Sequence, residues 1–335
     1  MGSGRPSSGR ATGRSHAWAE LLRVSALLSV PGDALAGAAA AGARPDRGTL
    51  RAIGASLCLY EAGMALNDWA DREEDALERP HRPLPSGRIT PRAALAASAA
   101  LTLTGLGLAS SAGRPALATA TALATTVWAY DLGLKHTPAG PATMATARAL
   151  DLLLGAIAST TGTPRPGLHA ARALPSAALL GAHTYAVTAV SRHETRGGST
   201  RAPLAALAVT LAVAGATSGG SKAPGTDATP EPPPPGGPRP APRPRPTLPV
   251  PASPLSRRLG PLLALAYART PATLLLHAAL NPSAPLTERA VGGGIRATIP
   301  LQAALAARGG APGTALALLG LIPAARALAR KVSPT

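Results

Sequence analysis

Apolar segments with few charged residues recur along almost the whole chain. Most have the roughly 20 residues that an α-helix needs to cross a bilayer, and one of them is at the short limit. Because the lipid core offers no water to the backbone, segments of this length are expected to be helices, not strands. They are residues 18–42, 49–66, 93–112, 115–134, 141–161, 172–190, 202–219, 259–279, 289–307 and 311–329. The sequence therefore predicts an all-α polytopic membrane protein with nine transmembrane helices, the last segment being either a tenth span or a helix along the interface.

The composition supports a membrane protein over a soluble one. Charged residues make up 15% of the 335 residues, whereas a soluble domain carries about 25%. The formal net charge of +17 would favour a nucleic-acid partner in a soluble protein. Here the arginines lie between apolar segments, where they orient helices and meet anionic lipid, so no nucleic-acid partner is expected. Cys58 is the only cysteine, which excludes an intramolecular disulfide and a cysteine-based metal site.

Four regions follow from these segments. Residues 1–17 form a basic tail that is predicted to be disordered, and residues 18–219 hold transmembrane helices 1–7 with both acidic motifs described below. Residues 220–256 are a proline-rich disordered linker, either a tolerated loop insertion or a site for a proline-binding partner. Residues 257–335 hold the C-terminal transmembrane helices. A cleaved signal peptide is the alternative for the N-terminus, but residues 18–42 exceed a typical signal-peptide core and further spans follow.

Basic residues in the loops predict the orientation in the membrane. With alternating spans, the loops after helices 2, 4 and 6 share one side, and they hold more arginine and lysine than the short loops of the other face. The positive-inside rule therefore places these charged loops in the cytoplasm.

The segment Leu66–Thr90, LNDWADREEDALERPHRPLPSGRIT, concentrates six carboxylates in an otherwise apolar chain. Asn67, Asp71 and Asp75 are spaced four residues apart, so a helix would carry them on one face. Carboxylates clustered in this way repel one another, and a divalent cation such as Mg²⁺ would relieve that repulsion. Arg79 and Arg82 follow and suit bidentate contacts with phosphate oxygens. The alternative is a solvated loop whose acids and arginines pair with each other.

The stretch NDWADREEDALERPHRPLPSGRIT resembles the first aspartate-rich motif of the UbiA superfamily of intramembrane prenyltransferases. The resemblance implies nine transmembrane helices around a central cavity that opens to the cytoplasm. It also implies an isoprenyl diphosphate bound through Mg²⁺ by two acidic motifs, one after helix 2 and one after helix 6. The prenyl group would pass to a small acceptor, usually aromatic.

Two further stretches resemble elements of the same superfamily. YDLGLKHTP supplies Tyr130, Asp131 and Lys135, of which Lys135 would contact the diphosphate or, alternatively, only set the topology. ARALDLLLGA supplies Arg148 and Asp151 inside an apolar span, where ionisable residues indicate function by default. Their spacing of three residues also allows a local ion pair.

The second acidic motif is depleted in this chain. The stretch VSRHETRGGSTRAP has Glu194 as its only carboxylate, with Arg192 and Arg196 available for phosphate. This stretch and the C-terminal RAVGGGIRATIPLQAALAARGGAP resemble a divergent subgroup encoded in ebo-type gene clusters. The resemblance implies an integral protein of the bacterial cell membrane.

The resemblance also implies a role for each of these side chains. The expected metal ligands are Asn67, Asp71, Asp75 and Glu194. The expected diphosphate contacts are Asn67, Arg79, Arg82, Tyr130, Lys135, Arg148 and Arg192. The expected catalytic residues are Asp71, Asp75, Lys135, Arg148 and Asp151, with Asp131 or Asp151 as a general base. Ring faces of Trp69, Tyr130 and Tyr185 are candidates to stabilise an allylic cation, although each ring could equally serve ordinary packing.

The expected function is Mg²⁺-dependent transfer of an isoprenyl group from a polyprenyl diphosphate to an aromatic or other small acceptor within the membrane. A catalytically silent relative, which binds or moves an isoprenoid lipid or pigment precursor, is the alternative that the depleted second motif favours. An unrelated transporter would fit the spans but leaves the spacing of Asn67, Asp71 and Asp75 unexplained.

Overall fold

The computed structural model describes residues 8–23, 29–194, 197–219 and 254–332, and these residues form helices and turns without any strand. The all-α prediction is therefore confirmed. The helices are α1 (Ser8–Leu21), α2 (Val30–Ala40), α3 (Arg47–Ala70), α4 (Arg72–Glu78), α5 (Pro91–Ser111), α6 (Arg114–Leu132), the short 3₁₀-helix η2 (Leu134–His136), α7 (Gly140–Ala158), α8 (Pro166–Ser191), α9 (Arg201–Ser218), α10 (Pro254–Leu280), α11 (Ala284–Arg308) and α12 (Pro312–Val332).

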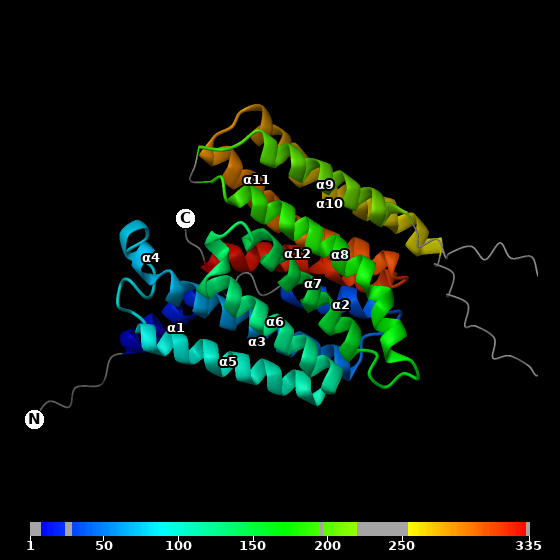
Figure 1. Ribbon diagram of the computed structural model, residues 1–335, viewed down its shortest axis with the longest axis horizontal. Helices are drawn as coiled ribbons and strands as arrows, with labels where there is room; N and C mark the ends of the chain where they lie inside the picture. Colours follow the sequence, from blue (N-terminus) through cyan, green and yellow to red (C-terminus); the bar gives the residue numbers. More distant parts are fainter. Residues whose placement is uncertain (1–7, 24–28, 195–196, 220–253, 333–335) are drawn as a thin grey trace, which may run out of the picture.

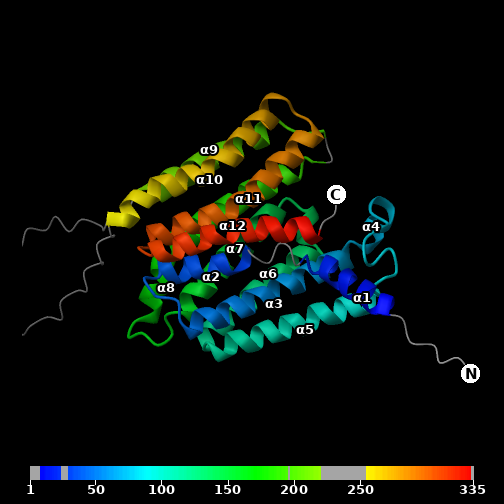
Figure 2. The same cartoon turned by 180° about the vertical axis from the view of Figure 1, so that it is seen from behind.

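The helices lie in three tiers. Figure 1 shows α3, α5 and α6 on one side of the bundle and α9 and α10 on the other, with α2, α7, α8 and α12 between them. Figure 2 shows the same order from behind. The closest neighbours are α3 with α5, α7 with α8, and α10 with both α9 and α11. Consecutive helices mostly pack side by side, so loops from distant parts of the sequence lie at the same end of the bundle.

Local sequence explains where several helices begin. Asp46 and Thr49 form a reciprocal capping box at the start of α3, since the Thr49 backbone amide donates to Asp46 Oδ1 at 2.9 Å and the Asp46 amide donates to Thr49 Oγ1 at 3.0 Å. The hydroxyl of Thr90 accepts a hydrogen bond from the Ala93 amide before α5. Proline occupies the first turn of α5, α6, α7 and α8, where its missing N–H leaves no helical bond unmade.

Four helices within the described ranges are long and apolar enough, by length and composition alone, to cross a membrane. They are Pro91–Ser111, Pro166–Ser191, Arg201–Ser218 and Arg258–Leu280. The other long helices carry more polar and charged residues, several of which lie in the site described below. The count of nine spans stays a prediction.

The N-terminal region differs from its prediction. Residues 8–17 were expected to lie in a disordered tail, but α1 begins at Ser8. The predicted first span, residues 18–42, is not one helix, because α1 ends at Leu21 and α2 runs from Val30 to Ala40. With 11 residues at 1.5 Å each, α2 is about 16 Å long, which is too short for a hydrocarbon core of about 30 Å. An apolar run read as one span therefore holds two shorter helices.

The proline-rich linker prediction falls mainly on residues 220–253, which lie outside the described residues. Its last three positions, residues 254–256, already belong to α10. The predicted boundary at residue 257 is therefore slightly late.

Small residues let α2 approach α7 so closely that their backbones touch. A Cβ atom added to Gly37 would lie 2.0 Å from the carbonyl oxygen of Leu152, and one added to Gly155 would lie 2.3 Å from Ala34 Cα. Glycines at both positions therefore set the distance between the two helices. The close approach brings polar residues of α2 against those of α7.

We expect Gly155→Ala to destabilise the fold by about 1–3 kcal/mol, because the new methyl group meets backbone atoms that cannot rotate away. Thermal unfolding in detergent measures the effect. The control is Gly215→Ala on α9, where an added Cβ meets nothing within 4 Å and alanine is the better helix former. Equal melting temperatures for the two variants would show that α2 and α7 are not in backbone contact.

Candidate active site

The acidic segment stays helical across the junction of α3 and α4. The backbone amide of Asp71 donates to the Asn67 carbonyl at 2.9 Å, and that of Asp75 donates to the Asp71 carbonyl at 2.8 Å. Asn67, Asp71 and Asp75 therefore follow one another at single helical turns, as their spacing predicts. In Figure 1, α4 lies at one end of the bundle, beyond the end of α3.

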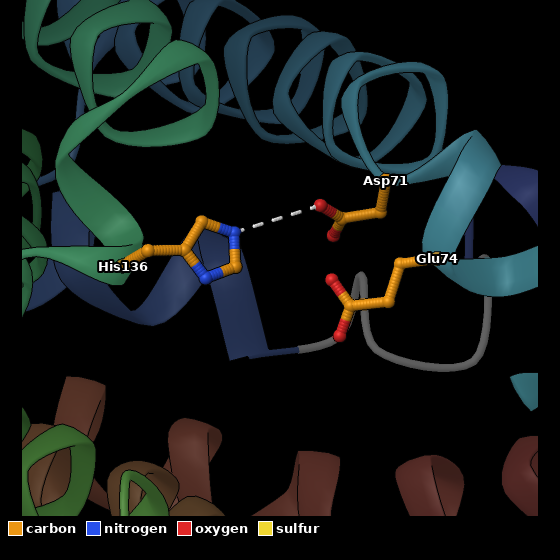
Figure 3. A group of neighbouring side chains, drawn as sticks. All are labelled: Asp71, Glu74 and His136. Atoms are coloured by element: carbon orange, nitrogen blue, oxygen red, sulfur yellow. Dashed lines mark ion pairs between the residues drawn. The ribbon is translucent and has the colours of Figure 1, made fainter.

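Asp71 lies at the centre of a small group of polar side chains. Its carboxylate forms an ion pair with Lys135, whose side chain is only 9% exposed, and lies 4.0 Å from His136 Nε2. Figure 3 shows Asp71 and Glu74 reaching from the α3–α4 junction toward His136 on η2. One ligand atom from each of these three residues lies within 4.8 Å of the others. The structure thus brings Lys135 to the first acidic motif.

Arginines hold the other aspartates of the motif. Arg82 Nη1 lies 2.7 Å from Asp75 Oδ2 and 3.6 Å from Asp68 Oδ1, so it bridges the two carboxylates. Arg79 lies 3.5 Å from Asp75, and Arg23 lies 3.4 Å from Asp68. Asp68 and Asp75 are 5% and 2% exposed. Acids and arginines therefore pair with each other here, as the alternative held, with the carboxylates buried and the side chains of Arg79 and Arg23 51% and 40% exposed.

A cavity of about 260 Å³ lies between α3, α6 and α7. Residues from three separate motifs line it: Asn67, Tyr130, Asp131, Arg148 and Asp151. Asn67 Nδ2 donates to Asp131 Oδ1 at 3.2 Å across the cavity wall. Much of the remaining lining is apolar, including Leu59, Met64, Leu123, Val127 and Met144. The cavity therefore combines a polar end with room for a hydrocarbon.

Arg148 pairs with Asp33, and not with Asp151 as the alternative of a local ion pair proposed. Arg148 Nη1 lies 2.9 Å from Asp33 Oδ2 on α2, while the carboxylate of Asp151 accepts a hydrogen bond from Ser56. Asp33 is fully buried, and its Oδ1 accepts a hydrogen bond of 2.6 Å from Gln302 Nε2 on α11. Arg148 thus enters the cavity from a network that joins three helices.

Sequence reasoning missed Arg23, Asp33, Ser56, Glu74 and Gln302. Asp33 and Gln302 carried a usable signal, since each is a polar side chain inside a predicted apolar span. Glu74 stands one helical turn after Asp71 within the motif already singled out. Arg23 and Ser56 carried the same signal, since they lie inside the predicted spans 18–42 and 49–66.

The second acidic motif is not gathered with the first. Glu194 lines a different cavity, of about 620 Å³, which includes Glu288, Arg289 and Arg296 of α11. Burial raises the pKa of Glu194 above its usual value and the charge of Glu288 adds to that rise, whereas the charge of Arg79 lowers it. Because Arg79 also contacts Asp75, it stands between the two motifs.

Three of the other predicted residues have different surroundings, and a fourth lies outside the described residues. The guanidinium of Arg192 donates to the carbonyl of Thr137, which ties the turn after α8 to the turn before α7. Arg196 lies outside the described residues. Trp69 stacks with Arg72, whose Cζ lies 4.8 Å from the ring centroid, and Tyr185 is 47% exposed. Of the three candidate rings, Tyr130 is the one that lines the cavity.

The donors near Asp71 fit Mg²⁺ in their chemistry. Mg²⁺ prefers carboxylate oxygens and water, so Asp71 and Glu74 are suitable ligands and His136 is not. The other predicted ligands have other surroundings: Asn67 contacts Asp131, Asp75 contacts Arg82, and Glu194 lines the second cavity. The structure therefore does not gather the four predicted ligands into one set.

Comparison with known proteins identifies the family of the chain. The model of the UbiA prenyltransferase family matches residues 30–218. Digeranylgeranylglyceryl phosphate synthase of Methanopyrus kandleri is 39% identical over 98 residues, which cover 29% of this chain and 36% of that protein. The chain thus aligns with only about a third of the length of this relative.

Two solved structures have the same fold. A digeranylgeranylglyceryl phosphate synthase covers 89% of this chain and 99% of its own, with a TM-score of 0.56 and 15% identity. A UbiA homologue from Aeropyrum pernix K1 covers 83% and 96%, with a TM-score of 0.58 and 15% identity. At such identity the likeness concerns the fold alone.

Proposed function

Because the chain belongs to the UbiA prenyltransferase family, we propose that it transfers an isoprenyl group from a polyprenyl diphosphate to a small acceptor within the membrane, with Mg²⁺. Membership of this family, together with its four apolar helices, makes the chain an integral membrane protein. The observation that carries the proposal is the cavity where Asn67, Asp131 and Arg148 meet beside the Asp71–Lys135 pair. Residues far apart in sequence converge there around a polar end and an apolar interior.

In the proposed reaction the diphosphate occupies the polar end of the cavity. Bound Mg²⁺, held by Asp71 and Glu74, would neutralise part of its charge. Lys135, Arg82 and Arg148 offer positive charge to the diphosphate as it leaves with the electron pair of the C–O bond. The apolar side chains around Leu123 and Val127 would hold the start of the prenyl chain.

The acceptor then attacks C1 of the prenyl group and releases a proton. Asp131 and Asp151 both line the cavity and are the candidate proton acceptors. The face of Tyr130 would stabilise positive charge that develops on the prenyl group. Exclusion of bulk water by the surrounding helices protects this cation from hydrolysis.

A silent relative that binds an isoprenoid without transferring it is the second candidate. The observation that favours it is the position of Glu194, which lines a separate cavity and leaves the first motif without a facing carboxylate. The two candidates share diphosphate binding and differ only in turnover.

The test uses the purified full chain in nanodiscs. Radiolabelled geranyl, geranylgeranyl and longer diphosphates are offered with a small-molecule extract, with Mg²⁺ or with EDTA. Label that moves into a lipid product only with Mg²⁺ supports the transferase. Mg²⁺-dependent binding without product supports the silent relative, and the absence of Mg²⁺-dependent binding would contradict both.

We further propose that the end of the bundle bearing α4 faces the cytoplasm. The loops after α3, α6 and α8 share this end, and they hold Arg79, Arg82, Lys135 and Arg192. Basic residues in short loops favour that side of the membrane. Residues 220–253, between α9 and α10, remain predicted to be a disordered linker.

A further inference from the structure

The second cavity carries charge that the proposed reaction does not use. It has a volume of about 620 Å³, and one face of α11 forms most of its wall. Glu288, Arg289, Gly292 and Arg296 recur on that face at helical spacing, and Glu194 closes the cavity from the turn after α8. Charged side chains therefore stand among the apolar Pro285, Val291 and Ile295 on this wall.

The two arginines of this wall have no acidic partner. Within the described ranges, neither Arg289 nor Arg296 takes part in any ion pair or side-chain hydrogen bond, although both are exposed to the cavity. Arg296 is twelve residues from the start of α11 at Ala284, which places it about 18 Å along the helix. An unpaired arginine at that depth is expensive, so a bound anion is the expected compensation.

Gly292, which has no side chain, leaves room for the Arg296 side chain to fold back toward the turn of Arg289. A Cβ added to Gly292 would lie 3.2 Å from Arg296 Nη1, so the guanidinium folds back over Gly292, one turn toward the start of α11. Gly292 is itself one turn from Arg289. Both side chains line the same cavity, and the Arg296 guanidinium is turned toward the helical turn that bears Arg289, which suits a single anion bound by both.

The two carboxylates of the cavity lie near each other, toward the start of α11. Glu288 is four residues from the start of α11, about 6 Å along the helix, and Glu194 lies in a turn outside the helices. Burial and the neighbouring Glu288 raise the pKa of Glu194. The cavity thus offers positive charge at Arg296 and carboxylate oxygens, suited to a hydroxyl or an amine, near the start of α11.

The cavity also adjoins the diphosphate site. Arg79 is close enough to Glu194 to influence its charge, and the same arginine lies 3.5 Å from Asp75. A molecule in the second cavity would therefore lie beside the first acidic motif.

We propose that Arg289 and Arg296 bind the anionic head group, a phosphate or a carboxylate, of the prenyl acceptor in this cavity. This proposal depends on the proposed prenyl transfer in one respect: it names the bound molecule as the acceptor of that reaction. Anion binding itself needs no turnover and no isoprenyl diphosphate, so the two proposals fail separately.

The test measures equilibrium binding of dodecyl phosphate and of dodecanoate to the full chain in phosphatidylcholine nanodiscs. We expect Arg296→Gln to raise the dissociation constant of one of these probes about tenfold or more, because a charge-assisted hydrogen bond is lost. The probe that is affected identifies the head group as a phosphate or a carboxylate. Gly292→Leu, which displaces the guanidinium without removing it, should have the same effect.

The control removes the same charge elsewhere. Arg269→Gln changes an exposed arginine of α10 that does not line the cavity. Unchanged binding by this control, with weakened binding by Arg296→Gln, supports the proposal. Three results overturn it: unchanged binding by Arg296→Gln, an equal loss in Arg269→Gln, or loss of probe binding in discs that contain phosphatidylglycerol, which would mark a bilayer-lipid site.

Discussion

Asp71→Asn is expected to lower the rate of prenyl transfer about 100-fold or more, with little change in shape. Asp71 is the one residue that both pairs with Lys135 and belongs to the group with Glu74 and His136. The amide keeps the volume of the side chain but removes the negative charge that Mg²⁺ requires. Transfer of radiolabel from geranylgeranyl diphosphate, titrated with Mg²⁺, measures both the rate and the metal requirement.

The matched control for this variant is Glu73→Gln. Glu73 lies two residues away on α4, its side chain is 88% exposed, and it pairs only with the neighbouring Arg72 at 3.2 Å. Surface pairs of this kind contribute about 0–1 kcal/mol, so transfer should be unchanged. Full activity of Asp71→Asn, or an equal loss in Glu73→Gln, would place the metal and the diphosphate elsewhere in the molecule.

The loss in Asp71→Asn must be separated from misfolding. Lys135 would keep its buried charge without its partner, so a lower melting temperature is expected as well. Circular dichroism of Asp71→Asn in detergent, compared with the unaltered protein, shows whether the variant is folded. A folded variant with weak Mg²⁺ dependence is the result that supports the assignment.

The sequence predicted most of the helices because their signal is local. Helices α5 to α12 lie close to the predicted apolar segments, and proline at their starts marks several boundaries. The split between α1 and α2 was not predicted. Residues 18–42 read as one apolar run, although Pro31 in the first turn of α2 is the same kind of start signal.

Several residues that line the candidate site had been singled out in the sequence, but their partners had not. Spacing alone placed Asn67, Asp71 and Asp75 on one face, because helical geometry fixes which neighbours align. Partners across the fold depend on tertiary packing. Asp33 and Arg148 are 115 positions apart in sequence, and nothing in the sequence selects Asp33 over the nearby Asp151.

In the second cavity, too, the sequence indicated one residue but not the residues around it. Glu194 stood out as the only carboxylate of its motif, but its neighbours Glu288 and Arg296 come from α11, about a hundred residues later. A depleted motif was therefore visible in the sequence, whereas the wall that surrounds it was not.

Asp33→Ala is expected to destabilise the protein by about 3–5 kcal/mol, because it leaves Arg148 buried without a countercharge. The Gln302 amide would also lose its acceptor at 2.6 Å. Asp33→Asn keeps an oxygen for Gln302 and should cost less. Unfolding in detergent, followed by circular dichroism, measures both variants.

A double-mutant cycle with Arg148→Met separates the ion pair from simple packing. If Asp33 acts mainly by neutralising Arg148, the double variant loses less stability than the sum of the two single variants. Additive losses would show that Asp33 supports the fold without acting on Arg148. Because Arg148 lines the cavity, a strong coupling in this cycle would also mean that α2 and α11, through Asp33 and Gln302, hold a positive charge in place for the diphosphate.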